Sequence, residues 1–185
     1  MIIQLISARR AVFPVQYSNT PIERHEIERI LEAANWAPTH RRTEPWRFKV
    51  FNSEDSRARL AGFLVDKYRK TAEKVSEIKA KKTAEKPLQS GCVIAICMQR
   101  DPLASVPEWE EIAAVAMAVQ NMWLMATDMG IGAYWSTPST IADFAELVPL
   151  NEGERCLGFF YMGKTDQELP QGVRKTGVSE KTTWV

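Results

Sequence analysis

The segment Glu108–Met129 constrains the fold more than any other part of this 185-residue chain. It is the most apolar stretch of helical length, but its uncharged part, Ile112 to Ala126, covers only 15 residues and includes Gln120 and Asn121. A helix that crosses a bilayer needs about 20 mostly apolar residues, so this one is too short and too polar. A helix that is apolar on most sides instead lies in the middle of a domain or at a subunit interface.

Length and composition predict a single domain over residues 1–185, because domains average about 150 residues. The hydrophobic share of 45% and the charged share of 25% are those of an ordinary globular protein. A net charge of +1 gives no general attraction to nucleic acid or to a membrane. The N-terminus has no basic region before an apolar stretch, so it is not a signal peptide, and we expect a reduced, cytoplasmic compartment.

The cysteine and histidine content argues against a metal centre. The three cysteines are an odd number without CxxC spacing, which supports neither a disulfide framework nor a zinc ribbon. Only two histidines, His25 and His40, are present. We therefore predict no metal site.

Short strands and helices are predicted without the regular alternation of a Rossmann fold, so the sequence favours an α+β fold with one central sheet. Thr20-Pro21-Ile22-Glu23 has the form of a capping box and predicts a helix that ends before Pro38. A short helix should end near Arg9, and a long charged helical region, which a break could divide, should follow residue 53. Strands are predicted at 46–51, 91–98, 133–136 and 156–162, with a short helix at 141–147.

Gly130-x-Gly132 resembles part of a dinucleotide-binding fingerprint but lies in the wrong context. A true fingerprint follows a strand and opens a helix, whereas these glycines follow a helix and precede a strand. A helix C-cap followed by a turn is the favoured interpretation.

Two polar segments are candidates for ligand binding, each with an ordinary alternative. Arg9-Arg10 is either a solvated pair at a helix C-terminus or a grip on a phosphate, which guanidinium groups bind in bidentate geometry. The segment 37–46, which contains His40, is either a solvated connector or a preorganised ligand loop. No nucleophile motif or pair of acids is evident, so an enzyme of this sequence would rely on a cofactor for its chemistry.

Four motifs appear in register along nearly the whole chain and together resemble the FMN-dependent nitroreductase family. They are Arg9-Arg10, Ala37-Pro38-Thr39-His40-x-x-x-Glu44-Pro45-Trp46-x-Phe48, the junction from Gly130-x-Gly132 to Tyr134-Trp135, and Leu157-Gly158-Phe159-Phe160-Tyr161-Met162-Gly163. The length, and Val106-Pro107-x-Trp109-Glu110 before the apolar helix, are most similar to the short nitroreductases of enterobacteria.

The resemblance implies a fold, an assembly and an activity. The fold is a mostly antiparallel sheet wrapped by helices, in an intertwined homodimer that binds two FMN molecules at the subunit interface. NADH or NADPH gives a hydride to flavin N5 and leaves, and a small acceptor such as a nitroaromatic or a quinone then takes the electrons, in a ping-pong reaction. A flavin-binding store or redox sensor without turnover is the alternative.

The resemblance also implies the site residues. The flavin carries the chemistry, and no side chain is expected to be catalytic. Arg9 and Arg10 would hold the FMN phosphate and ribityl oxygens, with Ala11 in place of the usual serine. His40 and Trp36 would reach the flavin from the partner subunit. Lys164 is a second phosphate ligand, with Arg174 as its rival. The remaining cofactor-binding positions are Arg42, Trp135, Ser136 and Thr137.

Two positions depart from the family pattern. Glu44 stands where glutamine is common, and Arg42 stands where larger relatives have asparagine. A carboxylate facing the flavin would disfavour its anionic reduced state, unless Arg42 pairs with Glu44 or Glu44 points elsewhere.

Two further features have ordinary explanations that we favour. Residues 67–86 contain eight basic and three acidic side chains but only one aromatic residue, Tyr68. A solvated helix face, or a mobile lid over the active site, is thus favoured over nucleic-acid binding, which would need interleaved aromatic residues. The methionines of the apolar helix are core or dimer filler, or else a pliable pocket wall.

Overall fold

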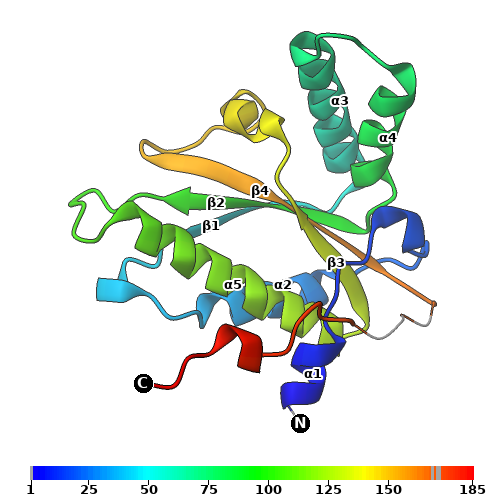
Figure 1. Cartoon of the computed structure of the whole chain (residues 1–185). Helices are drawn as coiled ribbons and strands as arrows, with labels where there is room; N and C mark the ends of the chain where they lie inside the picture. Colours follow the sequence, from blue (N-terminus) through cyan, green and yellow to red (C-terminus); the bar gives the residue numbers. More distant parts are fainter. Residues whose placement is uncertain (1, 168, 170–171) are drawn as a thin grey trace.

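The computed structural model describes residues 2–167, 169 and 172–185. Within them, one four-stranded sheet has the order β1-β2-β4-β3, and every neighbouring pair of strands is antiparallel. Helices cover both faces of the sheet (Figure 1). The predicted α+β fold, a mostly antiparallel sheet wrapped by helices, is confirmed. The strands are β1 (Trp46–Phe51), β2 (Cys92–Gln99), β3 (Ile131–Ser136) and β4 (Glu154–Lys164).

The helices divide between the two faces of the sheet. The α-helices are α1 (Ile2–Ala8), α2 (Arg24–Asn35), α3 (Glu54–Thr71), α4 (Glu77–Leu88) and α5 (Glu108–Asp128). The 3-10 helices are η1 (Pro14–Gln16), η2 (His40–Arg42), η3 (Ser139–Glu146) and η4 (Ser179–Lys181). In Figure 1, α2 and α5 lie along one side of the sheet, and the hairpin formed by α3 and α4 stands at its upper end together with η3.

Strand β2 is buried on both sides, which explains its continuous apolar sequence. Ile94 and Ile96 belong to the core cluster under α2 and α5. Val93 and Ala95 belong to a second cluster, which contains Leu60 of α3. Successive side chains of the strand thus serve opposite cores, and all four are fully buried.

The long charged region forms two helices, and α3 ends at Thr71 before α4 begins at Glu77. The expected start of α2 at Thr20 is wrong by a few residues, since the helix begins at Arg24 after Glu23 as N-cap. The backbone N–H of Glu23 donates to the Glu26 carboxylate at 2.8 Å. The preceding Ile22 is buried, 8% exposed, so hydrophobic docking holds this segment outside the helix.

Two glycines on neighbouring strands leave room for the segment that follows Arg10. Gly132 of β3 lies opposite Gly163 of β4. A Cβ on Gly132 would lie 2.8 Å from the Cβ of Val12, and one on Gly163 would lie 2.2 Å from the Cγ of Tyr17. Gly130 has a φ of 69° just after α5, as the predicted C-cap requires. Gly132 has a different role, because it leaves room for Val12.

Hydrogen bonds hold the same segment against the sheet. The N–H of Val12 donates to the Ala133 carbonyl at 3.0 Å, and the N–H of Ser18 donates to the Lys164 carbonyl at 2.7 Å. The Tyr17 hydroxyl donates to the Val12 carbonyl at 2.8 Å. Residues 11–18 are therefore fixed across the sheet, from the β3 edge at Ala133 to Lys164 of β4, and Arg9 and Arg10 enter from a defined position. No helix among the described residues has the length and apolarity to span a membrane.

Replacing Gly163 should destabilise the protein, because its Cβ would overlap the ring of Tyr17. We expect Gly163→Ala to lower the free energy of unfolding by about 2 kcal/mol or more, as overpacking does. Gly62, exposed on α3 with no atom near its missing Cβ, supplies the control. Gly62→Ala should raise stability slightly, by up to about 1 kcal/mol. Urea denaturation measures both variants, and equal stability of the two would contradict the docking.

Candidate functional site

The arginine pair lies beside α5, close to the C-terminal end of that helix. The guanidinium carbon of Arg9 lies 4.5 Å from the ring centroid of Trp123. The indole Nε1 of Trp123 donates to the carbonyl of Arg10 at 3.1 Å. One tryptophan thus orients both arginines, one through its ring face and the other through a backbone hydrogen bond.

A third guanidinium, that of Arg174, joins this pair. Gly172 lies against α1 and Arg10, because a Cβ there would be 3.5 Å from the Ser7 carbonyl oxygen and 4.0 Å from an Arg10 nitrogen. Partial burial, followed by the charges of Arg174 and Arg10, lowers the pKa of Arg9 below its usual value. Among the described residues, none of the three arginines forms an ion pair with a carboxylate. Three like charges without counter-charges are suited to an anion such as a phosphate.

Lys164 is already engaged. Its Nζ lies 3.0 Å from Oε1 of Glu26 on α2. Burial alone would raise the pKa of Glu26, but the backbone hydrogen bond at Glu23 and the contact with Lys164 outweigh it and hold that pKa below its usual value. Lys164 is thus already paired with a carboxylate of its own chain, whereas Arg174 forms no ion pair among the described residues.

The outer edge of β3 leads away from the arginine cluster. Ala11 forms a parallel bridge with Ala133, and the contact is through the backbone, so it does not require the hydroxyl that Ala11 lacks. In an antiparallel strand the outward-pointing backbone groups recur every second residue, so those of Trp135 face the same edge as those of Ala133. Trp135 therefore offers backbone donors and acceptors on the edge that receives the segment carrying Arg10, and Ser136 and Thr137 follow at the end of the strand.

Trp135 and Ser136 point to opposite faces of the sheet. The ring of Trp135 packs against the core under α2 and α5, and its buried Nε1 has no hydrogen-bond partner within the described chain. Ser136 lies on the other face and lines a cavity under the α3–α4 hairpin.

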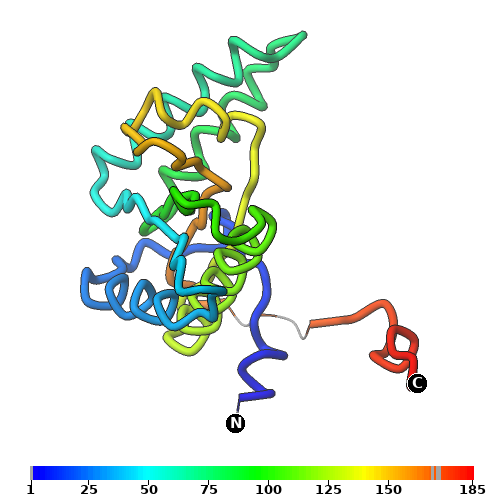
Figure 2. Tube along the Cα trace, turned by 90° about the vertical axis from the view of Figure 1, so that its left-hand side faces the viewer, coloured from blue at the N-terminus to red at the C-terminus, as the bar shows by residue number. Residues whose placement is uncertain are grey.

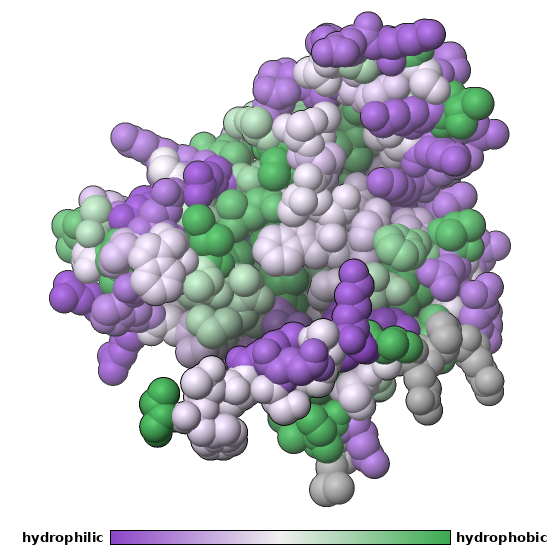
Figure 3. Space-filling view, viewed as in Figure 1, coloured by the Kyte–Doolittle hydropathy of each residue, from purple (hydrophilic) through white to green (hydrophobic). Residues whose placement is uncertain are grey.

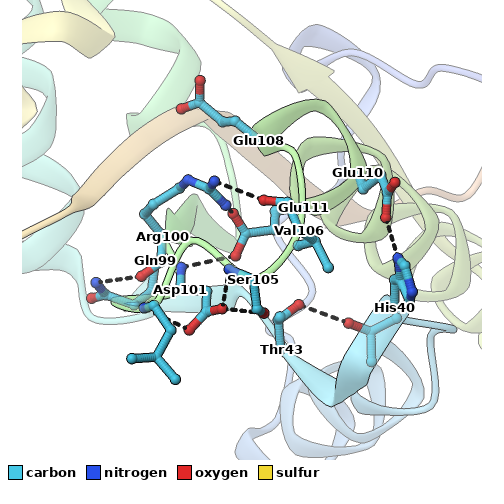
Figure 4. A network of polar contacts seen from close by, with 12 residues as sticks. His40, Thr43, Gln99, Arg100, Asp101, Ser105, Val106, Glu108, Glu110 and Glu111 are labelled. Carbon is cyan, nitrogen blue, oxygen red and sulfur yellow. Dashed lines mark hydrogen bonds and ion pairs between the residues drawn. The ribbon is translucent and has the colours of Figure 1, made fainter.

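His40 lies in a strained loop at the other end of α5. Its Nδ1 is 2.5 Å from Oε2 of Glu110 in the first turn of α5 (Figure 4). Arg41, Arg42 and Glu44 have φ values of 51°, 55° and 42°, a region that non-glycine residues rarely adopt. Such strain is concentrated at functional sites, which supports a ligand-binding role for this loop. Arg42 and Glu44 are exposed, and in the described part of the chain no ion pair joins them.

A buried acid fixes the end of α5 that His40 contacts. Glu111 is 1% exposed, forms an ion pair with Arg100 and accepts from the N–H of Asp101 at 2.8 Å. Hydrogen bonds from Ser105, first its side chain and then its backbone, lower the pKa of Asp101. Figure 4 shows this network beside the Glu110–His40 contact, so the loop before α5 and the His40 loop share one anchored helix end.

Helix α5 sets the distance between the two groups of candidate residues. His40 contacts Glu110, and the arginine pair contacts Trp123 thirteen residues further on. At a rise of 1.5 Å per residue the two contact points lie about 20 Å apart. The structure therefore brings Arg9, Arg10 and Arg174 together with the β3 edge, but it does not bring His40 to them within one chain.

An uncovered apolar surface accompanies this arrangement. Trp36 is 78% exposed, and its Nε1 donates to Glu32 at 2.8 Å. Ile112 and Met117 of α5 are also exposed, as is Ile3 of α1. Figure 3 shows pale and green surface across the middle of this view, where α5 runs in Figure 1, and purple atoms over the α3–α4 hairpin. In Figure 2 the C-terminal segment stands clear of the sheet and its helices.

These features define an α+β protein with a cationic, phosphate-type cluster beside an open sheet edge. The model of the Nitroreductase family matches residues 6–164, so the chain belongs to that family. It is 26% identical to "Putative NAD(P)H nitroreductase YfhC" of Bacillus subtilis, over 97% of this chain and 91% of that protein.

Solved structures agree with the fold. A nitroreductase-like family protein from Bacillus cereus matches with a TM-score of 0.86 and 26% identity, over 100% of this chain and 96% of that one. An oxidized iodotyrosine deiodinase bound to FMN and 3-iodo-L-tyrosine matches with a TM-score of 0.73 and 20% identity, over the whole of both chains.

Sequence reasoning missed Trp123 and Glu110 as the residues that orient the candidate site. Both lie on the helix that the sequence singles out, but their partners Arg10 and His40 are 113 and 70 residues away. No local pattern marks such pairs. The available signal in the sequence was that Trp123 is the one aromatic residue in the uncharged run from Ile112 to Ala126.

Inorganic phosphate should stabilise the protein by relieving the repulsion among the three arginines. At a concentration 100 times its Kd, a ligand adds about 2.7 kcal/mol to the free energy of unfolding. We expect thermal denaturation to show a higher Tm in phosphate than in chloride of equal ionic strength. Arg174→Ala should reduce this difference strongly, whereas Lys164→Ala should leave most of it. A larger loss in Lys164→Ala would reverse the assignment.

Proposed function

We propose that this protein is an FMN-dependent oxidoreductase that uses NADH or NADPH to reduce nitroaromatic, quinone or similar small acceptors in a ping-pong reaction. The observation that carries the proposal is the cluster of Arg9, Arg10 and Arg174, which lacks carboxylate partners among the described residues and adjoins an open sheet edge. Membership in the nitroreductase family supports the same activity. So do relatives whose names include NAD(P)H nitroreductase and FMN.

The residues of the cluster fit the phosphate of FMN. Arginine binds phosphate through parallel, charge-assisted hydrogen bonds. The lowered pKa of Arg9 reflects its partial burial and then the neighbouring charges of Arg174 and Arg10, which a dianion would offset. Arg174 takes the place that Lys164 would otherwise fill, since Lys164 is paired with Glu26. Ala11 would contribute through its backbone, and Trp135, Ser136 and Thr137 would contact the ring system from the β3 edge.

The bound flavin would supply the redox chemistry, accepting a hydride from the reduced nucleotide and passing electrons to the acceptor. The side chains of this protein bind and orient and need not form bonds to the substrate. Trp123 positions the two arginines, and the docked segment 11–18 fixes their distance from Ser136. A single open edge visited in turn by donor and acceptor suits a ping-pong order.

A homodimer would complete the site. His40, Arg42 and Trp36 lie on the far side of a separation of about 20 Å along α5, so they would reach the flavin from the partner subunit. The exposed apolar residues of α5 and α1 supply a surface for such a dimer. The cytoplasmic location expected from the sequence remains part of this proposal.

An absorbance spectrum tests the activity. The purified protein should be yellow, anaerobic NADH or NADPH should bleach the flavin, and an added quinone should restore the colour over many cycles. Flavin that binds but does not cycle would instead indicate the store or redox sensor, which the departures at Ala11, Arg42 and Glu44 motivate. A colourless protein that takes up no added FMN would end the proposal.

The paired change of Arg9→Ala with Arg10→Ala tests the phosphate assignment. Each lost charge-assisted hydrogen bond is worth about 1.5–3 kcal/mol, so the Kd for FMN should rise by roughly 100-fold or more. Far-ultraviolet circular dichroism and sedimentation should show an unchanged fold and oligomeric state. Unchanged FMN retention would refute the assignment.

A mixed dimer tests whether His40 acts on the partner's flavin. One subunit carries Arg9→Ala with Arg10→Ala, and the other carries His40→Ala, a change that should weaken FMN binding in the pure variant. If His40 acts across the interface, both defects fall on one site and the dimer keeps one tight FMN. If His40 acts within its own chain, each site carries a defect and neither is tight. Titration of FMN per dimer distinguishes the two.

A further inference from the structure

A cavity of about 290 Å³ lies between the α3–α4 hairpin and the end of β3. Its α4 wall contains Lys79, Thr83 and Lys86, which recur at the spacing of one helix face. Ser136 and Thr140, from the end of β3 and from η3, line the opposite wall. Both views of the molecule place the hairpin and η3 at the same end of the sheet (Figures 1 and 2).

The lining is cationic and rich in hydroxyl groups. Of the described residues that line the cavity, none is acidic. The ammonium group of Lys79 lies 5.0 Å from the ring centroid of Tyr68, and over the described chain neither Lys79 nor Lys86 forms an ion pair. The two acids of α4 are engaged elsewhere, since Glu77 pairs with Arg69 at 2.8 Å and Glu85 lies 3.9 Å from Lys81. The two cavity lysines are thus left to attract an anion.

Thr140 provides an independent sign of a ligand. The residue is 8% exposed and lines the cavity, and its Oγ1 is buried without a hydrogen-bond partner in the described part of the chain. Leaving a buried hydroxyl unpaired costs free energy, so native structures rarely tolerate it without a bound group or water. An anionic oxygen would accept the hydrogen bond that this hydroxyl cannot make within the protein.

Ion pairs connect the two walls of the cavity. Lys67 of α3, only 8% exposed, forms ion pairs with Glu146 and, at 3.4 Å, with Asp143, both in η3. The hydrogen bond that Lys67 donates to the Glu146 carboxylate offsets the loss of hydration and raises the pKa of Lys67, which therefore stays charged. The hairpin is held against η3 by charge, and the cavity between them has a defined width.

We infer that this cavity is an anion subsite that anchors the carboxylate or phosphate group of a substrate while the rest of that substrate extends toward Ser136. The inference rests on the proposed function, because Ser136 belongs to the strand segment that we assign to the flavin. Two sources share this chemistry. One is the 2′-phosphate of NADPH, and the other is the acidic group of an aromatic acceptor.

Kinetics of the FMN-loaded enzyme test the subsite and separate the two sources. The first comparison is kcat/KM for NADPH against NADH, and the second is kcat/KM for 4-nitrobenzoate against 4-nitrobenzyl alcohol. In Lys79→Gln with Lys86→Gln, the preference for the anionic member of one pair should fall by roughly 10-fold or more, since each 1.4 kcal/mol is a factor of ten. A fall in the first pair identifies the nucleotide phosphate, and a fall in the second identifies the acceptor.

Two further variants separate a subsite from the general positive field of the hairpin. Lys70→Gln with Lys74→Gln removes the same charge from exposed positions outside the cavity and should keep both preferences. Thr140→Val removes the unpaired hydroxyl and should lower the preference without loss of Tm. Equal losses in the two double variants, or no loss in Lys79→Gln with Lys86→Gln, would overturn the inference.

A binding measurement keeps this test distinct from that of the proposed function. Calorimetric titration of the FMN-loaded protein with 2′-AMP and with 4-nitrobenzoate should show that one of the two ligands binds. The double variant Lys79→Gln with Lys86→Gln should weaken that binding by about the same factor as it lowers the kinetic preference. If the flavin is never reduced by NADH or NADPH, the proposed function fails while this titration still reports on the cavity. If the flavin is reduced normally and neither ligand binds, the subsite alone fails.

Discussion

The docking of residues 11–18 onto β3 and β4 is the contact on which the candidate site depends. It requires two glycines in register, Gly132 and Gly163, because side chains at either position would overlap Val12 or Tyr17. The hydrogen bond from Val12 to Ala133 then sets where the chain crosses the strand. Arg9 and Arg10 are thereby carried to Trp123, and the open part of β3 begins directly beyond them. The docked backbone thus fixes the positions of two arginines. Without it, their side chains would move freely at the end of a short helix.

Helix α5 connects this docking to assembly. One side of it supplies Val115 and Met122 to a core under the sheet, while Ile112 and Met117 are exposed. Its first turn contacts His40, and its later turns hold the arginines, so a rigid helix keeps the two groups apart by about 20 Å. A helix that is apolar all round but buried on only one side is expected to be covered by a second copy. The same covering would bring a partner's His40 loop to an arginine cluster that has no such loop of its own.

The sequence could predict the elements whose signal is local. The apolar runs of β2 and α5 located these two elements to within a residue or two, because a buried element is marked by its own apolar residues. The start of α2 was wrong because Thr20 satisfies the capping rules, while the burial of Ile22 decides the outcome. The purpose of Gly132, the proximity of Arg174 to Arg9 and the pairing of Lys164 with Glu26 were also beyond sequence patterns. Each depends on a residue from a distant segment, namely Val12, Arg9 or Glu26.

The net charge of +1 conceals two positive regions that flank one strand segment. The arginine cluster adjoins Ala133, and the hairpin lysines face Ser136, three residues along β3. At about 3.3 Å per residue, Ala133 and Ser136 lie roughly 10 Å apart along the strand. A reduced flavin carries negative charge, and Coulomb attraction in a partly dry site acts over several ångströms. Positive charge at both ends would therefore favour the reduced cofactor, and would offset the disfavouring effect of Glu44 if that residue faces the ring.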